Sequence, residues 1–124
     1  KSQGDSLLSN MAKVDSQSIT PRAISEAARK GDALSLEVLR ETGEIIGAAL
    51  SSVVNLLNLP LIIIGGGIAQ AGDLLFKPIE ESIRKRALPI PRKRVKVVST
   101  KLGEWAGVIG AAALAMKEMQ DFLK

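Results

Sequence analysis

The sequence predicts a mostly helical α/β fold with few strands. Two short runs rich in apolar and β-branched residues, 61–64 and 94–99, have the length of strands, and the segment between them repeats apolar residues with helical spacing. Two strands joined through a helix predict a parallel pair. The chain has 124 residues, 46% of them hydrophobic, which is enough for one domain with a core.

Helix start and stop signals divide the first part of the chain. A short helix is expected over 6–14. Thr20 and Pro21 predict the start of the next helix, because threonine caps free amides and proline suits the first helical position. Gly31 ends that helix, and Asp32 is expected to cap the one that follows.

A long helix is expected over 33–57, where apolar residues recur every three or four positions. Gly43 and Gly47 lie four residues apart on it, so another element can pack closely against this face. The helix is expected to stop near Asn58 and Pro60, immediately before the first strand.

A further helix is expected to begin at Asp73 and to end at the basic run 84–86, with Pro78 tolerated only in or near its first turn. The two prolines within 89–91 predict an extended connection to the second strand. A final helix is expected over 105–123.

The segment from Leu61 to Gly72 is the feature around which the rest of the chain is organised. Its apolar run is expected to be a strand buried on both faces, and three glycines follow it directly. Ligands of open α/β sheets bind at the carboxyl ends of strands, and glycines let backbone amides come close to a bulky group. The segment is therefore a candidate ligand platform.

The spacing of these glycines does not match two familiar phosphate-binding patterns. A P-loop needs Lys and Ser or Thr where this chain has Asp73 and Leu74, and a dinucleotide fingerprint needs a third glycine where it has Gln70. A flat group such as adenine, or a ribose, suits bare backbone better than a phosphate does. A tight strand-to-helix turn with close packing explains the same glycines equally well.

The composition excludes several kinds of chemistry. The chain contains no cysteine and no histidine, which removes disulfides, thiol nucleophiles, zinc sites of the Cys/His kind and histidine general bases. Aromatic residues make up 2%, too few for base-stacking platforms. The net charge of +4 is compatible with a phosphate-bearing ligand and with an ordinary basic surface. Pro60 interrupts the uncharged stretch 45–72, so no membrane span is expected.

Charged residues form one other candidate site. The basic run from Arg84 to Lys96 is either a patch for nucleic acid or a phosphoprotein, or a solvated connection whose charges guard a sheet edge. The second interpretation is favoured because no aromatic residue lies nearby. Asp32, Asp73 and Glu104 stand at helix starts, where capping is expected rather than catalysis.

Four segments occur in order between Ile19 and Met116 and cover most of the chain. They are Ala27-Ala28-Arg29-Lys30-Gly31-Asp32, Val54-Asn55-Leu56-Leu57-Asn58-Leu59-Pro60, Ile63-Ile64-Gly65-Gly66-Gly67-Ile68 and Leu102-Gly103-Glu104-Trp105-Ala106-Gly107-Val108-Ile109-Gly110-Ala111-Ala112. Together they resemble the ROK family of repressors, open reading frames and sugar kinases.

The resemblance implies a partial RNase H-like lobe of the actin–hexokinase superfamily. Residues 1–124 would be a single domain, the C-terminal part of the second lobe, cut from a longer chain. Gly65, Gly66 and Gly67 correspond to the family's adenosine motif, where a nucleotide lies against the backbone, and Ile68 would border the same pocket. The family's phosphate motif, catalytic aspartate, sugar-binding residues and zinc motif have no counterpart here, so no catalytic or metal residue is assigned.

Three functions remain open. The resemblance implies the adenosine-binding portion of an ATP-dependent sugar kinase, with Mg²⁺ on the phosphates; the upstream half of the same protein would complete the active site, and this chain alone is expected to be inactive. It also allows the sugar-sensing and dimerising portion of a transcriptional repressor that binds DNA through an upstream domain. Either protein is expected to be a cytoplasmic homodimer without a membrane partner. Outside the family, the alternative is a basic binding module built on Arg84 to Lys96.

Overall fold

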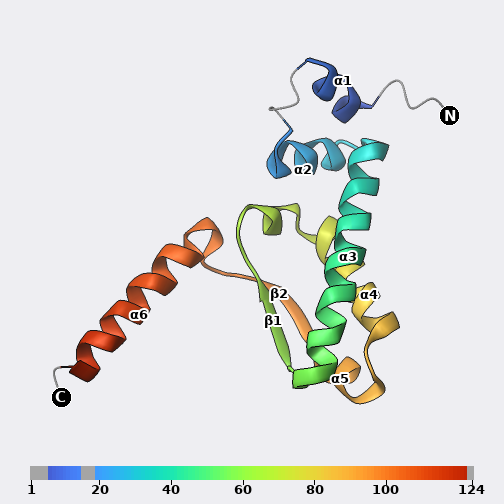
Figure 1. Cartoon of the computed structure of the whole chain (residues 1–124). Coiled ribbons are helices and arrows are strands. Elements are labelled where there is room, and N and C mark those ends of the chain that lie inside the picture. The colour runs from blue at the N-terminus through green and yellow to red at the C-terminus, as the bar shows by residue number, and fades with distance from the viewer. Residues whose placement is uncertain (1–5, 15–18, 123–124) are drawn as a thin grey trace.

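The computed structural model describes residues 6–14 and 19–122 and shows a mostly helical α/β fold (Figure 1). The elements in chain order are α1 (Leu7–Val14), α2 (Pro21–Arg29), α3 (Ala33–Leu57), β1 (Leu61–Ile64), the 3₁₀ helix η2 (Gly67–Ala71), α4 (Asp73–Arg86), α5 (Pro89–Arg94), β2 (Lys96–Ser99), the 3₁₀ helix η3 (Gly103–Trp105) and α6 (Ala106–Phe122). β1 and β2 form a parallel sheet, with Leu61 opposite Lys96 and Ile64 opposite Ser99. The predicted combination of few strands and many helices is confirmed.

Local signals set several helix ends as predicted. The Thr20 hydroxyl accepts a hydrogen bond from the Ala23 amide at 3.1 Å at the start of α2. α3 spans the expected residues and ends at Asn58, which has a left-handed conformation with a φ of 50°.

Two glycines allow α3 and α4 to pack closely. A Cβ atom on Gly43 would lie 2.7 Å from the Cβ of Pro78, and one on Gly47 would lie 2.6 Å from the carbonyl oxygen of Ile79. Both distances are shorter than van der Waals contact, so this approach requires glycine. We expected Pro78 in or near the first turn of its helix, and it is the sixth residue of α4, inside the helix and just beyond that turn. Its ring lies against Gly43 of α3.

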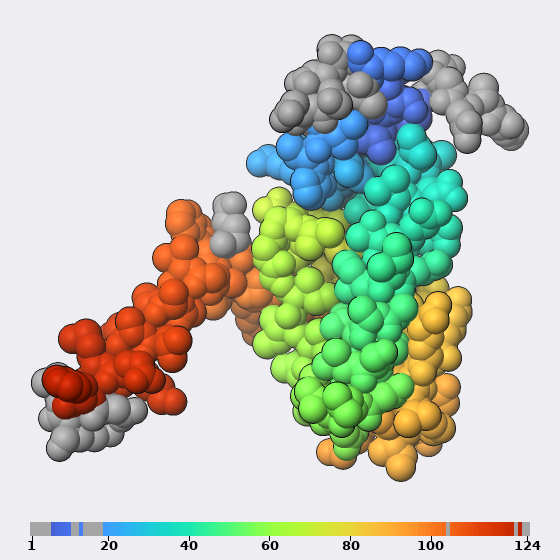
Figure 2. Space-filling model, in the orientation of Figure 1, coloured from blue at the N-terminus to red at the C-terminus, as the bar shows by residue number. Residues whose placement is uncertain are grey.

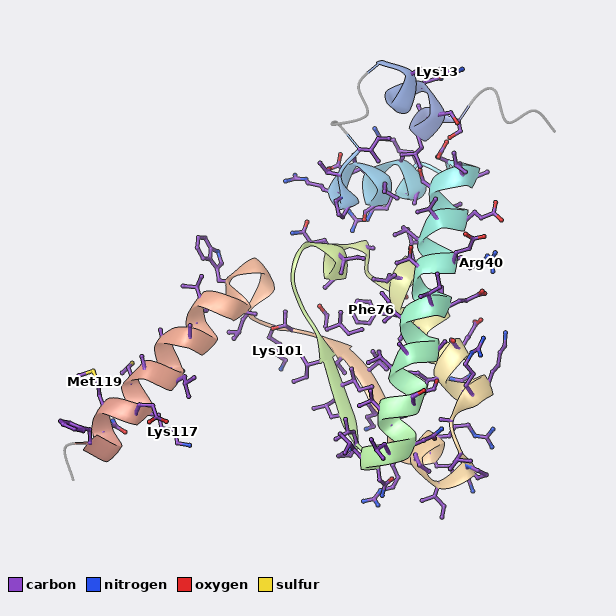
Figure 3. All side chains as sticks on the ribbon, viewed as in Figure 1. Lys13, Arg40, Phe76, Lys101, Lys117 and Met119 are labelled. Carbon is purple, nitrogen blue, oxygen red and sulfur yellow. The ribbon has the colours of Figure 1, made fainter. Side chains whose placement is uncertain are left out.

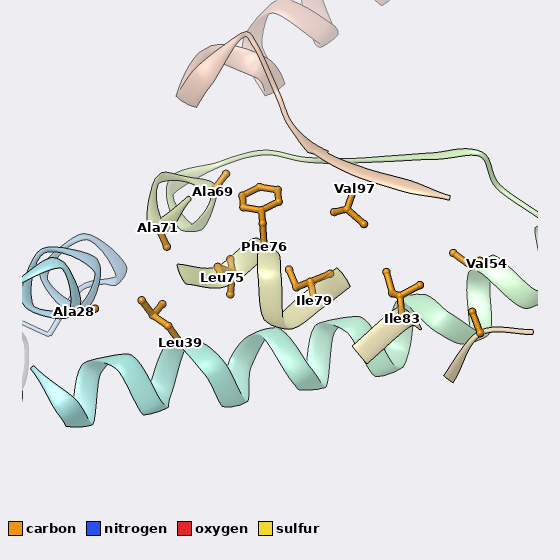
Figure 4. Close-up of a cluster of buried hydrophobic side chains, with 11 residues drawn as sticks. Ala28, Leu39, Val54, Ala69, Ala71, Leu75, Phe76, Ile79, Ile83 and Val97 are labelled. Carbon is orange, nitrogen blue, oxygen red and sulfur yellow. The ribbon is translucent and has the colours of Figure 1, made fainter. Parts of the chain in front are cut away.

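The hydrophobic core lies between the sheet and the helices α3 and α4 (Figure 4). Leu75 and Ile79 of α4 are fully buried, and so is Val54 near the end of α3. The ring of Phe76 lies between α4 and the strands, where Val97 of β2 faces the same core (Figures 3 and 4). The core is therefore almost entirely aliphatic.

β1 is covered on one face only, so the prediction of burial on both faces is wrong. Ile62 and Ile64 are half-buried against the core, whereas Leu61 and Ile63 are 47% and 62% exposed. α3 and α4 lie on the same side of the sheet (Figure 4), and the β1 side chains on the other side are exposed.

The connection between α4 and β2 is helical, so the prediction of an extended connection is wrong. Pro89 occupies the first position of α5, and Pro91 follows within the first turn, where backbone amides have no partner inside the helix. The prolines therefore start a short helix, and β2 begins at Lys96.

α6 extends away from the rest of the molecule (Figures 1 and 2). Its described side chains are exposed from Gly107 onward, including Val108, Leu114 and Met116 at 63%, 61% and 65%. The helix thus presents apolar side chains that the other described residues leave uncovered.

Asp32 joins α1 to α3. Its carboxylate accepts a hydrogen bond from the Ser35 amide at 2.9 Å, which caps α3 as predicted. It also accepts from the Leu7 amide at 2.7 Å and the Ser6 hydroxyl at 3.1 Å, at the start of α1. Burial raises the pKa of Asp32, but the hydrogen bonds from Ser35, Ser6 and Leu7 outweigh burial and lower the pKa from 3.8 to about 2.

Replacing Asp32 by alanine should lower the free energy of unfolding by about 1–2 kcal/mol near neutral pH, because two helix starts lose an acceptor. The pKa in the folded state lies below the ordinary value, so the carboxylate stabilises the fold above about pH 4, and this contribution is lost as the pH falls toward about 2. Urea unfolding at several pH values should show the stabilities of variant and wild type converging in acid. Asp73→Ala, at a helix start without a side-chain cap, should change stability by less than about 0.5 kcal/mol. Equal losses of stability in Asp32→Ala and Asp73→Ala would contradict the capping role of Asp32.

Candidate functional site

The carboxyl ends of β1 and β2 meet at one edge of the sheet and carry the glycine loop. The amide of Thr100, directly after β2, donates to the carbonyl oxygen of Ile64 at 2.9 Å, so pairing continues to the ends of both strands. A Cβ atom on Gly65 would lie 3.2 Å from Cγ2 of Thr100. The two loops that follow the strands therefore lie side by side.

Gly66 turns the chain from β1 into η2. Its φ is +80°, which favours glycine, and its carbonyl oxygen accepts a hydrogen bond from the Ala69 amide at 3.2 Å. Gly72, with a φ of +60°, makes the next turn into α4. Arg29, at the end of α2, donates a hydrogen bond to the carbonyl oxygen of Gln70 and so holds η2 against α2.

A concave site of about 100 Å³ opens between the two loops. It is lined by Gly66, Ala69, Gln70, Ser99, Thr100 and Gly103. None of these lining residues has a titratable side chain. A Cβ atom on Gly66 or Gly67 would meet no other atom within 4 Å, so the space beside both glycines is open. These walls can hold a flat neutral group by van der Waals contact and hydrogen bonds, and they offer no acid or base for catalysis.

The predicted site residues take different places around this concavity. Gly66 lines it, whereas Gly65 is not among the lining residues and lies against Thr100. Gly67 begins η2 beside open space. Ile68 is half-buried and packs against the hydrophobic core.

The sequence-based prediction missed the second wall of the site. Thr100 and Gly103 follow the second strand, and parallel strands bring their carboxyl ends to the same edge of a sheet. That signal was present in the sequence and pointed to these residues. The anchoring role of Arg29 carried no comparable signal, because it depends on how α2 packs against η2.

The acidic residues add no second chemical site among the described side chains. Asp73 is the first residue of α4, the helix start at which it was expected, and its carboxylate is placed favourably for the helix dipole, although it makes no capping hydrogen bond and pairs with Lys77 at 3.2 Å. The side chain of Glu104 lies outside the described part of the structure. In residues 6–14 and 19–122, we find no group of three His, Cys, Asp or Glu side chains arranged to hold a metal ion. The described helices include none that is long and apolar enough to cross a membrane.

The sheet, its glycine loop and the concave site at the strand ends define an α/β protein whose site is lined by small or uncharged residues. A family model described as the ROK family matches residues 3–118. The chain belongs to the ROK family, and the resemblance seen in its sequence motifs is confirmed.

Relatives of the chain include both repressors and kinases. The DNA-binding transcriptional repressor Mlc of Escherichia coli (strain K12) is 35% identical over 96 residues, which cover 77% of this chain and 24% of the repressor. A glucokinase of Halalkalibacterium halodurans is 35% identical over 106 residues, which cover 86% of this chain and 32% of the glucokinase. The chain thus spans between 24% and 32% of the length of these two curated relatives.

A solved structure of a ROK protein also matches this chain over part of its length. The crystal structure of a ROK family glucokinase from Streptomyces griseus, in complex with glucose and AMPPNP, matches with a TM-score of 0.72 at 31% identity. The match covers 87% of this chain and 37% of the glucokinase chain. The described fold therefore corresponds to one portion of a larger ROK protein structure.

Proposed function

We propose that this chain is the adenosine-binding, C-terminal part of the second lobe of a ROK-family ATP-dependent sugar kinase. In this proposal residues 1–124 form a single domain of RNase H-like fold within a longer protein. The glucokinase relatives and the Streptomyces griseus structure with AMPPNP support it.

The observation that carries the proposal is the concave site at the carboxyl ends of β1 and β2. Gly66 and Gly67 leave bare backbone beside open space, which suits the face of a purine or a ribose. Gly65 and Ile68 complete the adenosine loop by packing it against Thr100 and the core. A volume of about 100 Å³ accommodates part of a nucleoside, so the upstream half of the protein is expected to supply the remaining contacts.

The catalytic groups belong to the upstream half in this proposal. ATP, with Mg²⁺ on its phosphates, supplies the phosphoryl group that is transferred to a sugar hydroxyl. The described residues of the site contribute orientation of the nucleoside and no proton transfer. The apolar side chains exposed on α6 are expected to be covered in the complete protein, by the upstream half or by the second copy of a homodimer.

The second candidate function is the sugar-sensing and dimerising part of a transcriptional repressor. Its specific support is the identity to Mlc, which equals the identity to the glucokinase at 35%. In that case DNA binding belongs to an upstream domain, and the strand-end site does not need to accept a nucleotide.

Activity of the complete protein distinguishes the two functions. We expect ATP-dependent phosphorylation of a sugar such as glucose, measured as ADP release, and no turnover by the 124-residue chain alone, because its described site offers no acid or base. Turnover by the short chain would contradict this division of roles. A complete protein without kinase activity that binds duplex DNA and releases it when a sugar is added would be a repressor.

A further inference from the structure

A second cavity lies along β2 and is bounded by α4 and α5. Its volume is about 300 Å³, which is within the range of small-molecule sites. Ile83, Val95 and Val97 form an apolar floor. Val97 is buried and Ile83 is almost fully buried, so this floor is a fixed part of the core. The cavity is separate from the strand-end site, with which it shares no lining residue.

Three cations from three different elements surround this cavity. They are Arg84 of α4, Arg92 of α5 and Lys96 of β2. Arg92 donates a hydrogen bond from Nη1 to the carbonyl oxygen of Arg84 at 3.3 Å, which draws the α5 guanidinium onto the last turn of α4. Side chains tipped with nitrogen accordingly gather around the end of α4 and α5 (Figure 3). The basic run of the sequence is thus folded around a concavity.

These charges are available to a ligand. Within the described part of the chain, no carboxylate forms an ion pair with Arg84, Arg92 or Lys96. One carboxylate, that of Glu80, lies on the cavity wall, so the wall carries three positive charges and one negative charge. An anion that also carries hydroxyl groups suits both the positive and the negative side chains of this wall. The cations hold the anionic group, and Glu80 accepts a hydrogen bond from a hydroxyl.

The open edge of β2 adds a backbone donor. The amides of Lys96 and Thr100 donate to Pro60 and Ile64, on the β1 side. Alternate residues of a parallel strand bond to the same neighbour, so the amide of Val97 points to the opposite edge. In the described chain β1 is the only strand that pairs with β2, and Val97 lines the cavity.

We propose that this cavity is a binding site for a small phosphomonoester. Two guanidinium groups, one ammonium group and a strand-edge amide match the charge and the acceptor oxygens of a phosphate dianion. The apolar floor contacts the carbon skeleton, and Glu80 binds its hydroxyl groups. The concave shape, the volume of about 300 Å³ and the absence of an aromatic residue from the lining favour a small ligand over a nucleic acid.

Calorimetric titration of the complete protein with inorganic phosphate, glycerol phosphate and glycerol tests the proposal. We expect phosphate and glycerol phosphate to bind, glycerol phosphate more tightly, and glycerol alone not to bind. The double variant Arg84→Gln with Arg92→Gln should weaken binding of both anions by about tenfold or more, because each arginine contributes charged hydrogen bonds.

The matched control is Lys85→Gln with Lys93→Gln. It removes the same charge from the same two helices, but neither lysine lines the cavity. This control should keep the affinity for glycerol phosphate within about twofold of wild type. Equal losses in the two double variants would show a general charge effect and overturn the proposal, as would absence of binding by both phosphate probes. Salt-sensitive binding of duplex DNA that both variants reduce equally would also overturn it and identify a nucleic-acid patch.

Discussion

Replacing Gly67 by leucine in the complete protein should weaken ATP binding by about tenfold or more and leave the melting temperature unchanged. A Cβ atom at Gly67 meets no other atom within 4 Å, and Gly67 is not among the glycines with positive φ. The side chain therefore fills the space proposed for the nucleoside without straining the loop. Equilibrium binding of ATP and thermal unfolding measure the two effects.

Gly107→Leu is the matched control for this prediction. Gly107 also has open space beside it and no positive φ, but it lies on α6, outside the strand-end site. This variant should keep the ATP affinity of wild type. Gly66 is a less informative position, because its φ of +80° would strain any side chain whether or not a nucleotide binds there. Unchanged ATP affinity in Gly67→Leu would remove the glycine loop from the nucleotide site.

The second large expected effect is a loss of stability on replacing Gly47. Gly47→Ala should lower the free energy of unfolding by about 2–3 kcal/mol, because the new methyl group would lie 2.6 Å from both the Ile79 carbonyl oxygen and the Cβ of Ser82. Both atoms belong to the packed face of α4, so α3 and α4 must separate. Urea unfolding of the 124-residue chain measures the change.

The same substitution at an exposed helical glycine provides the control. A Cβ atom on Gly110 of α6 would meet no other atom within 4 Å, so Gly110→Ala should be neutral or stabilise by up to about 1 kcal/mol through helix propensity alone. Destabilisation of both variants by the same amount would show that helix propensity, and not the contact between α3 and α4, determines the result.

Elements specified by local signals were predictable from the sequence. Thr20 and Asp32 cap the helices that they were expected to cap, and α3 has the expected ends. The wrong predictions concern features that depend on tertiary packing. Leu61, for example, is exposed because the helices cover one face of the sheet only.

One wall of the candidate site, the glycine loop after β1, was also predictable from local sequence signals. The glycines after β1 form a pattern within one short segment of the chain. Ser99, Thr100 and Gly103 lie at the end of β2 and in the segment that follows it, more than thirty residues later, and only the register of β1 against β2 brings them to Gly66. The cavity at Arg84, Arg92 and Lys96 likewise required the fold, because a run of charges in sequence does not show which of them converge.

Backbone amide chemical shifts in the complete protein, recorded during titration with a non-hydrolysable ATP analogue, show whether the strand-end site holds the nucleotide. We expect saturable shifts at Gly66, Thr100 and Gly103, which line the strand-end site, and at Gly67, which lies beside open space directly after Gly66. Saturation by the analogue with no shift at these four residues would contradict nucleotide binding at this site.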